Sequence, residues 1–243
     1  MKTIELSRKD KIKGLSLPTK ITEELAYLVG VLAGDGNICV RSYKNDYRIK
    51  CVGDPKKEVE FYKQVLKPIF KKIFNIDIDV REQDSGTTYG FYVYSKALVE
   101  YFTKTFELPI GKKYDELKIP TIIRKKRLII PFIRGLADTD FCVTYKKKNR
   151  CCIAGASKSK RFMKEIADEL KKMGFKFYEV YDYRVKDIRF RAGYFLISRI
   201  EINSKSSIKL WIDKIGFWNP RNINKIKIAG VGVSDGHESV VHF

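Results

Sequence analysis

Two aspartates stand out because each closes a short apolar segment in which small residues recur four positions apart. The aspartates are Asp35 and Asp140, 105 positions apart; the small residues are Gly30 and Gly34 before the first and Gly135 and Thr139 before the second. Carboxylate oxygens are ligands that hard divalent cations prefer, Mg²⁺ above all. If the two acids meet in space, they predict a metal site.

The segment before Asp35 is predicted to be a helix. Apolar residues at positions 25, 28, 29 and 32 recur at helical spacing. The two glycines leave a second face bare, where another backbone can approach closely. Two such helices packed through their bare faces would bring both acids together, beside carbonyls that have no partner within the helix and at the negative ends of the helix dipoles. The alternative, two ordinary core helices with exposed terminal acids, is disfavoured by the duplication.

The two segments are LVGVLAGDG at residues 28–36 and IRGLADTDF at residues 133–141. They resemble the two motif copies of a single-chain LAGLIDADG homing endonuclease of the intron-encoded type. The resemblance implies an α+β fold of two pseudo-symmetric αββαββα halves, each with a four-stranded antiparallel sheet, joined through the two motif helices into a DNA-binding saddle. It also implies that the acidic helix ends hold the metal ions that cut both DNA strands.

Carried over position by position, the resemblance assigns the metal-binding acids to Asp35 and Asp140. It adds the backbone carbonyls of Gly34 and Thr139 as further metal ligands. The final glycine of the motif is kept in the first copy but replaced by Phe141 in the second, where only backbone freedom is certainly lost.

A catalytic lysine is also implied, because in this family a lysine just after the second strand of a half often stabilises charge or positions the attacking water. The stretch ASK at residues 156–158 matches, so Lys158 joins the two aspartates as an expected catalytic residue. An ordinary surface lysine is the alternative. The first half has no lysine at the matching place, which leaves its activity to Asp54, to a displaced Lys56, or to metal and water alone.

The chain is strongly basic, with a net charge of +20 over 243 residues. Residues 1–110 hold 19 basic and 15 acidic side chains, whereas residues 111–243 hold 30 and 14. The second half is therefore expected to supply more of the attraction to a polyanion. A ribosomal-type basic protein is the alternative, which the paired helix segments disfavour.

The apolar segments and the cysteines indicate where the protein is located and which metal it is unsuited to bind. No stretch approaches the twenty apolar residues of a membrane span, and the N-terminus lacks the apolar region of a secretory signal. The five cysteines form no CxxC pair. This pattern argues against a zinc site and favours a reducing, cytoplasmic location.

Composition along the chain divides it into five parts. A basic N-terminal arm (1–20) precedes the first half (21–106), a linker with prolines and a glycine (107–120), the second half (121–216) and a C-terminal tail (217–243). YGFYVYSKALVEYF in the first half is echoed by YFLISRIEINSKSSIKLWI in the second, each a strand that leads into a Ser-Lys helix start. This echo supports the duplication independently of the aspartates.

Charged side chains alternate with apolar ones in the predicted strands, so one face of each sheet is expected to lie in the DNA major groove. Arginine and glutamine can contact base edges, whereas lysines more often bind phosphates. A solvated strand face is the alternative for any single residue. Arg189 and Arg191 are placed in a strand over residues 188–197. The full set comprises Asn37, Arg41, Tyr43, Arg48, Lys50, Arg81, Gln83, Lys146, Lys148, Arg150, Tyr183, Arg184, Lys186, Arg189 and Arg191.

These features predict a monomeric endonuclease that makes a double-strand break in a long asymmetric site of double-stranded DNA. Mg²⁺ is the expected cofactor, with Mn²⁺ or Ca²⁺ as substitutes. The asymmetry follows from two unlike halves on one chain. The alternatives are an RNA-binding maturase that assists splicing of an intron RNA and a non-cleaving DNA-binding protein; the two retained acids favour cleavage. An intein insert is disfavoured, because Met1 is not a Cys or Ser nucleophile.

Overall fold

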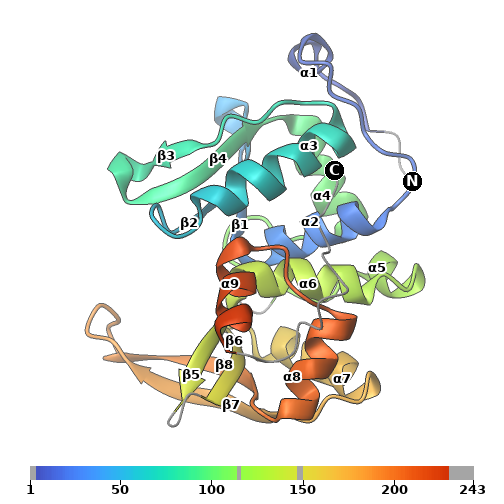
Figure 1. Cartoon of the computed structure of the whole chain (residues 1–243). Coiled ribbons are helices and arrows are strands. Elements are labelled where there is room, and N and C mark those ends of the chain that lie inside the picture. The colour runs from blue at the N-terminus through green and yellow to red at the C-terminus, as the bar shows by residue number, and fades with distance from the viewer. Residues whose placement is uncertain (1–3, 114–115, 147–149, 230–243) are drawn as a thin grey trace.

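The chain folds into two similar halves, which lie one above the other in Figure 1. The computed structural model describes residues 4–113, 116–146 and 150–229. The elements of the first half are α2 (Glu23–Gly34), β1 (Gly36–Arg41), the 3₁₀ turn η1 (Ser42–Lys44), β2 (Asp46–Gly53), the π-helical segment η2 (Phe61–Leu66), α3 (Lys67–Phe74), β3 (Arg81–Gln83), the 3₁₀ turn η3 (Asp84–Gly86), β4 (Thr88–Tyr94) and α4 (Lys96–Phe106).

The second half repeats this order of elements after a short helix, α5. Its elements are α5 (Thr121–Lys125), α6 (Ile129–Asp140), β5 (Phe141–Lys146), β6 (Arg150–Ser157), α7 (Lys160–Lys172), β7 (Tyr178–Lys186), β8 (Tyr194–Ile202) and α8 (Lys205–Lys214). The strands pair antiparallel in the orders β1-β2-β4-β3 and β5-β6-β8-β7. Two αββαββα halves with four-stranded antiparallel sheets confirm the predicted α+β fold class.

The two halves keep an almost constant offset along the chain. Gly36 and Phe141, which begin β1 and β5, are 105 positions apart, as the two motif aspartates are. Asp46 and Arg150, which begin β2 and β6, are 104 apart, so the second hairpin is one residue shorter. Equivalent positions in the two halves can therefore be read directly from the sequence.

Hydroxyl side chains set the starts of the helices that carry the core. Thr22, Ser95, Ser159 and Ser204 each accept a hydrogen bond from a backbone N–H in the first turn of α2, α4, α7 and α8, which satisfies one of the donors that a helix start leaves free. Within the described ranges, no helix combines the length and the apolar character that a membrane crossing needs.

Helices α2 and α6 lie between the two sheets and pack backbone against backbone (Figure 1). A Cβ on Gly30 would lie 2.0 Å from the carbonyl oxygen of Phe132, and a Cβ on Gly135 would lie 1.9 Å from the carbonyl oxygen of Tyr27. Tyr27 and Phe132 are themselves 105 positions apart, so the two contacts are images of each other under a pseudo-two-fold axis. Only glycine permits this approach.

The replaced motif glycine is compensated within the second half. A Cβ on Gly36 would lie 2.5 Å from the carbonyl oxygen of Leu32, so β1 can begin there only without a side chain. In the second half the large residue is buried instead: Phe141 stacks on Trp211 with ring centroids 5.6 Å apart. Its cross-strand partner is Gly155, where a Cβ would lie 2.0 Å from the Phe141 ring. In the first half the equivalent pair is Gly36 and Cys51, so the glycine of the second half lies on the opposite strand, where it leaves room for the Phe141 ring.

The segments outside the repeats are more structured than the sequence indicates. The N-terminal arm contains the short helix α1 (Arg8–Ile12), which starts with a capping box between Ser7 and Asp10. The segment predicted to be a C-terminal tail begins with the helix α9 (Pro220–Ile228), which is capped by Asn219 and contacts β5. Residues 217–229 are thus packed structure, which sequence comparison of the halves missed because α9 has no counterpart; residues 230–243 lie outside the described part.

The linker between the halves runs along the edge of the first sheet. Ile110 forms a parallel bridge with Ile38 in β1, and the Gly111 N–H donates to the Ile38 carbonyl over 2.7 Å. Further on, Leu117 and Ile119 are buried. The start of the linker is therefore held against strand β1 rather than crossing freely between the halves.

Adding one methyl group to the helix contact should destabilise the chain. We expect Gly30→Ala and Gly135→Ala each to lower the free energy of unfolding by about 1–3 kcal/mol, because each Cβ overlaps a backbone oxygen that cannot move without separating the helices. Chemical denaturation measures this loss. Lys164→Ala, at an exposed position of α7, is the control and should shift stability by less than about 0.5 kcal/mol. Glycine variants as stable as this control would contradict the close packing.

Candidate active site

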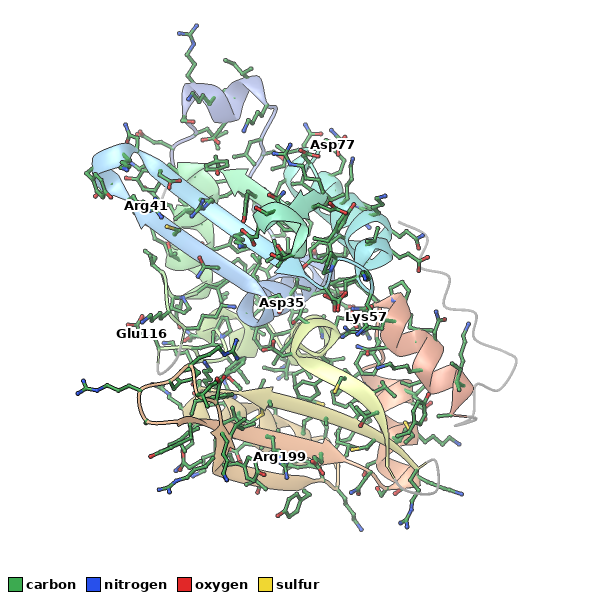
Figure 2. The ribbon with its side chains drawn as sticks, turned by 90° about the vertical axis from the view of Figure 1, so that its left-hand side faces the viewer. Asp35, Arg41, Lys57, Asp77, Glu116 and Arg199 are labelled. Atoms are coloured by element: carbon green, nitrogen blue, oxygen red, sulfur yellow. The ribbon has the colours of Figure 1, made fainter. Side chains whose placement is uncertain are left out.

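The two motif aspartates meet where α2 and α6 end. Asp35 is the residue after α2, and Asp140 is the last residue of α6. A Cβ on Gly34 would lie 2.0 Å from the Thr139 hydroxyl oxygen and 3.3 Å from the carboxyl carbon of Asp140. The acid of the second half thus lies against the helix end of the first. Figure 2 shows Asp35 between the sheet that carries Arg41 and the sheet that carries Arg199.

The electrostatics of this point favour a positive charge. Burial, together with the charges of Asp140 and Glu58, raises the pKa of Asp35. Burial also raises the pKa of Asp140. The positive charge of Lys113 lowers the pKa of both carboxyl groups and so opposes the effect of burial. A pair of partly desolvated acids beside helix C-termini, where backbone carbonyls face outward, attracts cations.

A lysine of the linker already supplies one cation at this point. The ammonium of Lys113 donates to the carbonyl oxygens of Leu32 over 3.0 Å and Ala33 over 2.9 Å, and also to that of Gly34. Burial lowers its pKa. Sequence reasoning missed Lys113, because its place depends on the path of the linker, and the linker shows no periodic pattern from which that path can be read.

The oxygen atoms present suit a hard divalent cation. In the part of the chain that the structure describes, no group of three or more His, Cys, Asp and Glu side chains is placed to hold a metal ion. The available donors are instead two carboxylates and the backbone carbonyls at the two helix ends. All are hard oxygen ligands. The Lys113 ammonium donates to three of these carbonyl oxygens, where a metal ion could bind instead. The predicted ligand at Gly34 is therefore engaged by Lys113.

Lys158 lies at the same cleft as Asp140. A cleft of about 370 Å³ is lined by residues that include Gly34, Asn37, Lys113, Asp140 and Lys158. The Lys158 ammonium lies 4.9 Å and 4.8 Å from the ring centroids of Phe190 and Phe195. These cation–π contacts hold it beside the hairpin that joins β7 and β8. The structure thus places Asp140 and Lys158 at one cleft, and the catalytic role of Lys158 stays a prediction.

The first half offers an acid where the second half offers this lysine. At the offset of 104, Asp54 is the counterpart of Lys158. The Asp54 carboxylate accepts from the backbone N–H groups of Lys56 over 2.9 Å and Lys57 over 3.0 Å, and its own N–H donates to Glu58 over 2.8 Å. Lys56 is exposed, and its recorded contact with Asp54 is through the backbone.

A second acid of the motif, Asp138, supports the helix pair from inside. It is fully buried and accepts from the Tyr27 hydroxyl over 2.6 Å and from the Trp218 backbone N–H over 2.9 Å. Burial raises its pKa to about 7. The Asn219 side-chain amide donates to the Asp138 carbonyl over 2.9 Å. This network ties α2, α6 and the start of α9 together directly beside Asp140.

The predicted groove residues of the first half lie on one face of their sheet. Directly opposed residues share a face, and the register pairs Asn37 with Lys50, Arg48 with Tyr94, Lys50 with Tyr92, Arg81 with Gly90 and Gln83 with Thr88. The alternate residues, such as Ile38 and Ile49, are buried under the helices.

Several of these side chains already have partners. The Arg48 guanidinium lies 5.4 Å from the ring centroid of Tyr92, and the Lys50 ammonium donates to Asp84 over 2.6 Å. Arg41 is 4.0 Å from Asp46, whereas Tyr43 is 80% exposed at the tip of the first hairpin. These contacts hold the cationic side chains on the open face of the sheet.

The second half differs from the predicted arrangement in two ways. Residues 187–193 form a turn rather than a strand. Asp187 accepts hydrogen bonds from the backbone and the side chain of Arg189, and Gly193 has a φ of +69°. Arg189 and Arg191 therefore lie at the tip of the hairpin. Tyr183 and Arg184 are neighbours on opposite faces of β7, since they oppose Ile197 and Leu196.

The Lys146 side chain and Lys148 lie outside the described part, while Arg150 is exposed at the start of β6 and Lys186 ends β7.

Arg199 is the residue of this face that the sequence analysis missed. It opposes Ala156 on the open face, and its guanidinium lies 4.7 Å from the ring centroid of Tyr183. It also lies 3.7 Å from Glu201. The alternation Arg199, Glu201 in the strand over residues 194–202 was the signal that could have identified it.

The sequence and fold are similar to those of proteins already described. Residues 128–216 match the family model of a LAGLIDADG-like domain. A crystal structure of I-DmoI in complex with DNA and Ca is similar with a TM-score of 0.58 and 21% identity, over 85% of this chain and 97% of that one. The homing endonuclease I-WcaI bound to its DNA recognition sequence is similar with a TM-score of 0.55 and 13% identity, over 90% and 92%. At these identities the likeness establishes the fold.

A curated relative matches over a smaller part of its own length. The Replication factor C small subunit of Methanocaldococcus jannaschii is 27% identical over 205 residues, which are 84% of this chain and 10% of that protein. The chain therefore spans about a tenth of the length of this relative.

The buried hydrogen bond to Asp138 should contribute measurably to stability. We expect Tyr27→Phe to lower the free energy of unfolding by about 1.5–3 kcal/mol, because a buried carboxylate loses a donor. The matched control is Tyr62→Phe, whose hydroxyl lies 3.8 Å from the Cys51 sulfur and should cost at most about 1 kcal/mol. Urea denaturation of both variants measures the difference, and equal losses would contradict the proposed importance of the Asp138 network.

Proposed function

We propose that this chain, which carries the duplicated LAGLIDADG motif on the fold of the single-chain homing endonucleases, is a site-specific endonuclease of double-stranded DNA. It would hydrolyse one phosphodiester bond in each strand. The observation that carries this proposal is the meeting of Asp35 and Asp140 at the ends of two pseudo-symmetric helices, between two sheets with cationic open faces. A DNA-binding protein that does not cut needs no pair of acids facing the phosphates.

DNA as the partner is supported by the surface and by the relatives. The open face of the first sheet carries Arg48, Lys50 and Arg81 in register, and that of the second carries Arg199. Two-stranded β-ribbons fit the major groove. The structures of I-DmoI and I-WcaI, whose fold the chain shares, are both complexes with DNA. We propose that both sheets lie in successive turns of the major groove, and that a single chain suffices because it contains both halves.

A divalent cation, Mg²⁺ in this proposal, would be held by the carboxylates of Asp35 and Asp140 and by the carbonyls of Gly34 and Thr139. Such an ion activates water and neutralises charge on the leaving oxygen. The support is the hard oxygen donor set and the cation-like position of Lys113. I-DmoI has been crystallised with DNA together with Mn and together with Ca, which supports a divalent cofactor.

The other residues of the chain would bind and orient the phosphate. Lys158, at the cleft beside Asp140, places a positive charge where the phosphate gains negative charge as its bond breaks. The aromatic rings under its ammonium keep this charge in place without neutralising it. The helix pair, held rigid by its glycine contacts, fixes the distance between the two centres and hence the separation of the two cuts.

Because the two halves are unlike, the target is proposed to be long and asymmetric. A symmetric dimer reads a palindrome, whereas two different sheets on one chain read two different half-sites. The unequal strands of the two sheets and their different side chains support this proposal.

Removing either acid should stop cleavage and leave binding. We expect Asp35→Asn and Asp140→Asn each to reduce cleavage of a target plasmid in Mg²⁺ by at least roughly 100-fold. Binding of the same DNA should be kept or slightly tightened, because a negative charge near phosphates is lost. Plasmid linearisation and gel-shift titration measure the two quantities.

The control is Asp213→Asn, at an exposed position of α8, which should cut like the unmodified chain. The substrate is drawn from a library of the joined sequences that flank the reading frame. Tight binding of intron RNA, with no cleavage of any duplex in any divalent metal, would instead favour the maturase function.

The affinity for DNA should depend steeply on salt, because each lysine or arginine that binds a phosphate releases counterions. We expect Arg48→Ala to weaken binding and to lower the slope of log affinity against log salt concentration by about 1 if it contacts one phosphate. Lys164→Ala, on the helical side away from the sheet, should leave the slope unchanged. Fluorescence anisotropy over a salt series measures both, and a flat response of the unmodified chain would contradict the cationic-face proposal.

A further inference from the structure

The first-half centre contains two acids besides Asp35, of which Asp54 has an ion-pair partner in its own half, Lys57, at 3.7 Å. Asp54 stands where the second half has Lys158, and Glu58, which is only 5% exposed, lies one turn further along the chain. The charge of Glu58 contributes to the raised pKa of Asp35. If both centres bind equivalent phosphates, the first lacks the cation that the second receives from its own strand end.

An arginine from the far end of the chain lies against these acids. Nη1 of Arg221, in the first turn of α9, is 2.9 Å from a carboxylate oxygen of Glu58. The Glu58 carboxylate also accepts from the Asp54 N–H over 2.8 Å, so Arg221 lies against the segment that carries the residue in place of the lysine. Its Nε is buried and has no hydrogen-bond partner among the described residues.

Helix α9 is anchored to the second half while it delivers this arginine to the first. The Lys225 ammonium donates to the Val143 carbonyl in β5 over 3.0 Å, and the Tyr145 hydroxyl donates to the Lys225 carbonyl. At the start of α9, the Trp218 N–H and the Asn219 amide bind Asp138. Four contacts thus fix the helix on one half, and the Arg221 side chain extends from it to the other.

We propose that Arg221 contacts the phosphate at the first-half centre and supplies there the positive charge that Lys158 supplies at the second. This inference rests on the proposed endonuclease function. A guanidinium fits the role because it stays charged and presents several donors in one plane, so it can keep Glu58 on one edge and bind a phosphate oxygen on another. The two cuts would then depend on different cations: an arginine of α9 for one strand, and Lys158 for the other.

Strand-resolved cleavage tests this assignment. A duplex target labelled separately on each strand is cut by the unmodified chain, by Arg221→Met, by Arg221→Lys and by Lys158→Met. We expect Arg221→Met to slow one strand by roughly 10- to 1,000-fold and to change the other by less than about threefold, so that nicked duplex accumulates. Lys158→Met should slow the opposite strand. Arg221→Lys should recover part of the lost rate, because the charge is kept.

Glu58→Gln separates this role from a purely structural one. It breaks the ion pair between the halves but leaves the Arg221 charge in place, so it should not reproduce the strand bias. If Arg221 serves only as a tie between the halves, Arg221→Met and Glu58→Gln will slow both strands equally and lower the melting temperature together, which would overturn the assignment. Equal rates on both strands in Arg221→Met at unchanged stability would also overturn it. Failure of the unmodified chain to cut any duplex would overturn the proposed function itself.

Discussion

The close approach of two helix backbones at Gly30 and Gly135 is the constraint on which the rest of the structure depends. Because neither position has a side chain, α2 and α6 lie near enough for each to touch a carbonyl oxygen of the other. The helix ends are thereby forced together, and with them Asp35 and Asp140. A wider separation, as ordinary core packing gives, would leave two independent half-domains with one acid each.

The repulsion between buried acids in this geometry is offset by cations from two segments of the chain. Two partly buried acids at helix C-termini repel each other, and Glu58 adds a third negative charge nearby. The compensating cations come from segments outside the repeats: Lys113 from the linker and Arg221 from α9. The segments that break the internal symmetry are therefore those that lower the repulsion between the two acids.

The sequence predicted well whatever repeats or alternates. The motif helices, the order of elements in both halves and the open face of the first sheet follow from periodicity and from the 105-residue offset, because burial enforces them at every position. The sequence predicted poorly the positions of residues that depend on the course of a linker, a turn or an unrepeated helix. Lys113 and Arg221 carry no local pattern. Arg189 and Arg191 alternate like strand residues, yet Asp187 and Gly193 close a turn around them. Phe141 looked like a loss of freedom, and its compensation by Gly155 could be recognised only once the register was known.

The outer hairpins of the two sheets differ in the length of their paired strands. Strands β7 and β8 have nine residues each, whereas β3 has three and β4 has seven. At about 3.3 Å per residue, β7 is roughly 30 Å long and β3 roughly 10 Å. The paired part of the outer hairpin is therefore shorter in the first sheet, where three residues of β3 pair with β4, than in the second, where seven residues of β7 pair with β8. In the DNA complex proposed above, the outer bases of the two half-sites would lie against hairpins of unequal paired length, so tolerance of base changes would be uneven between the two half-sites.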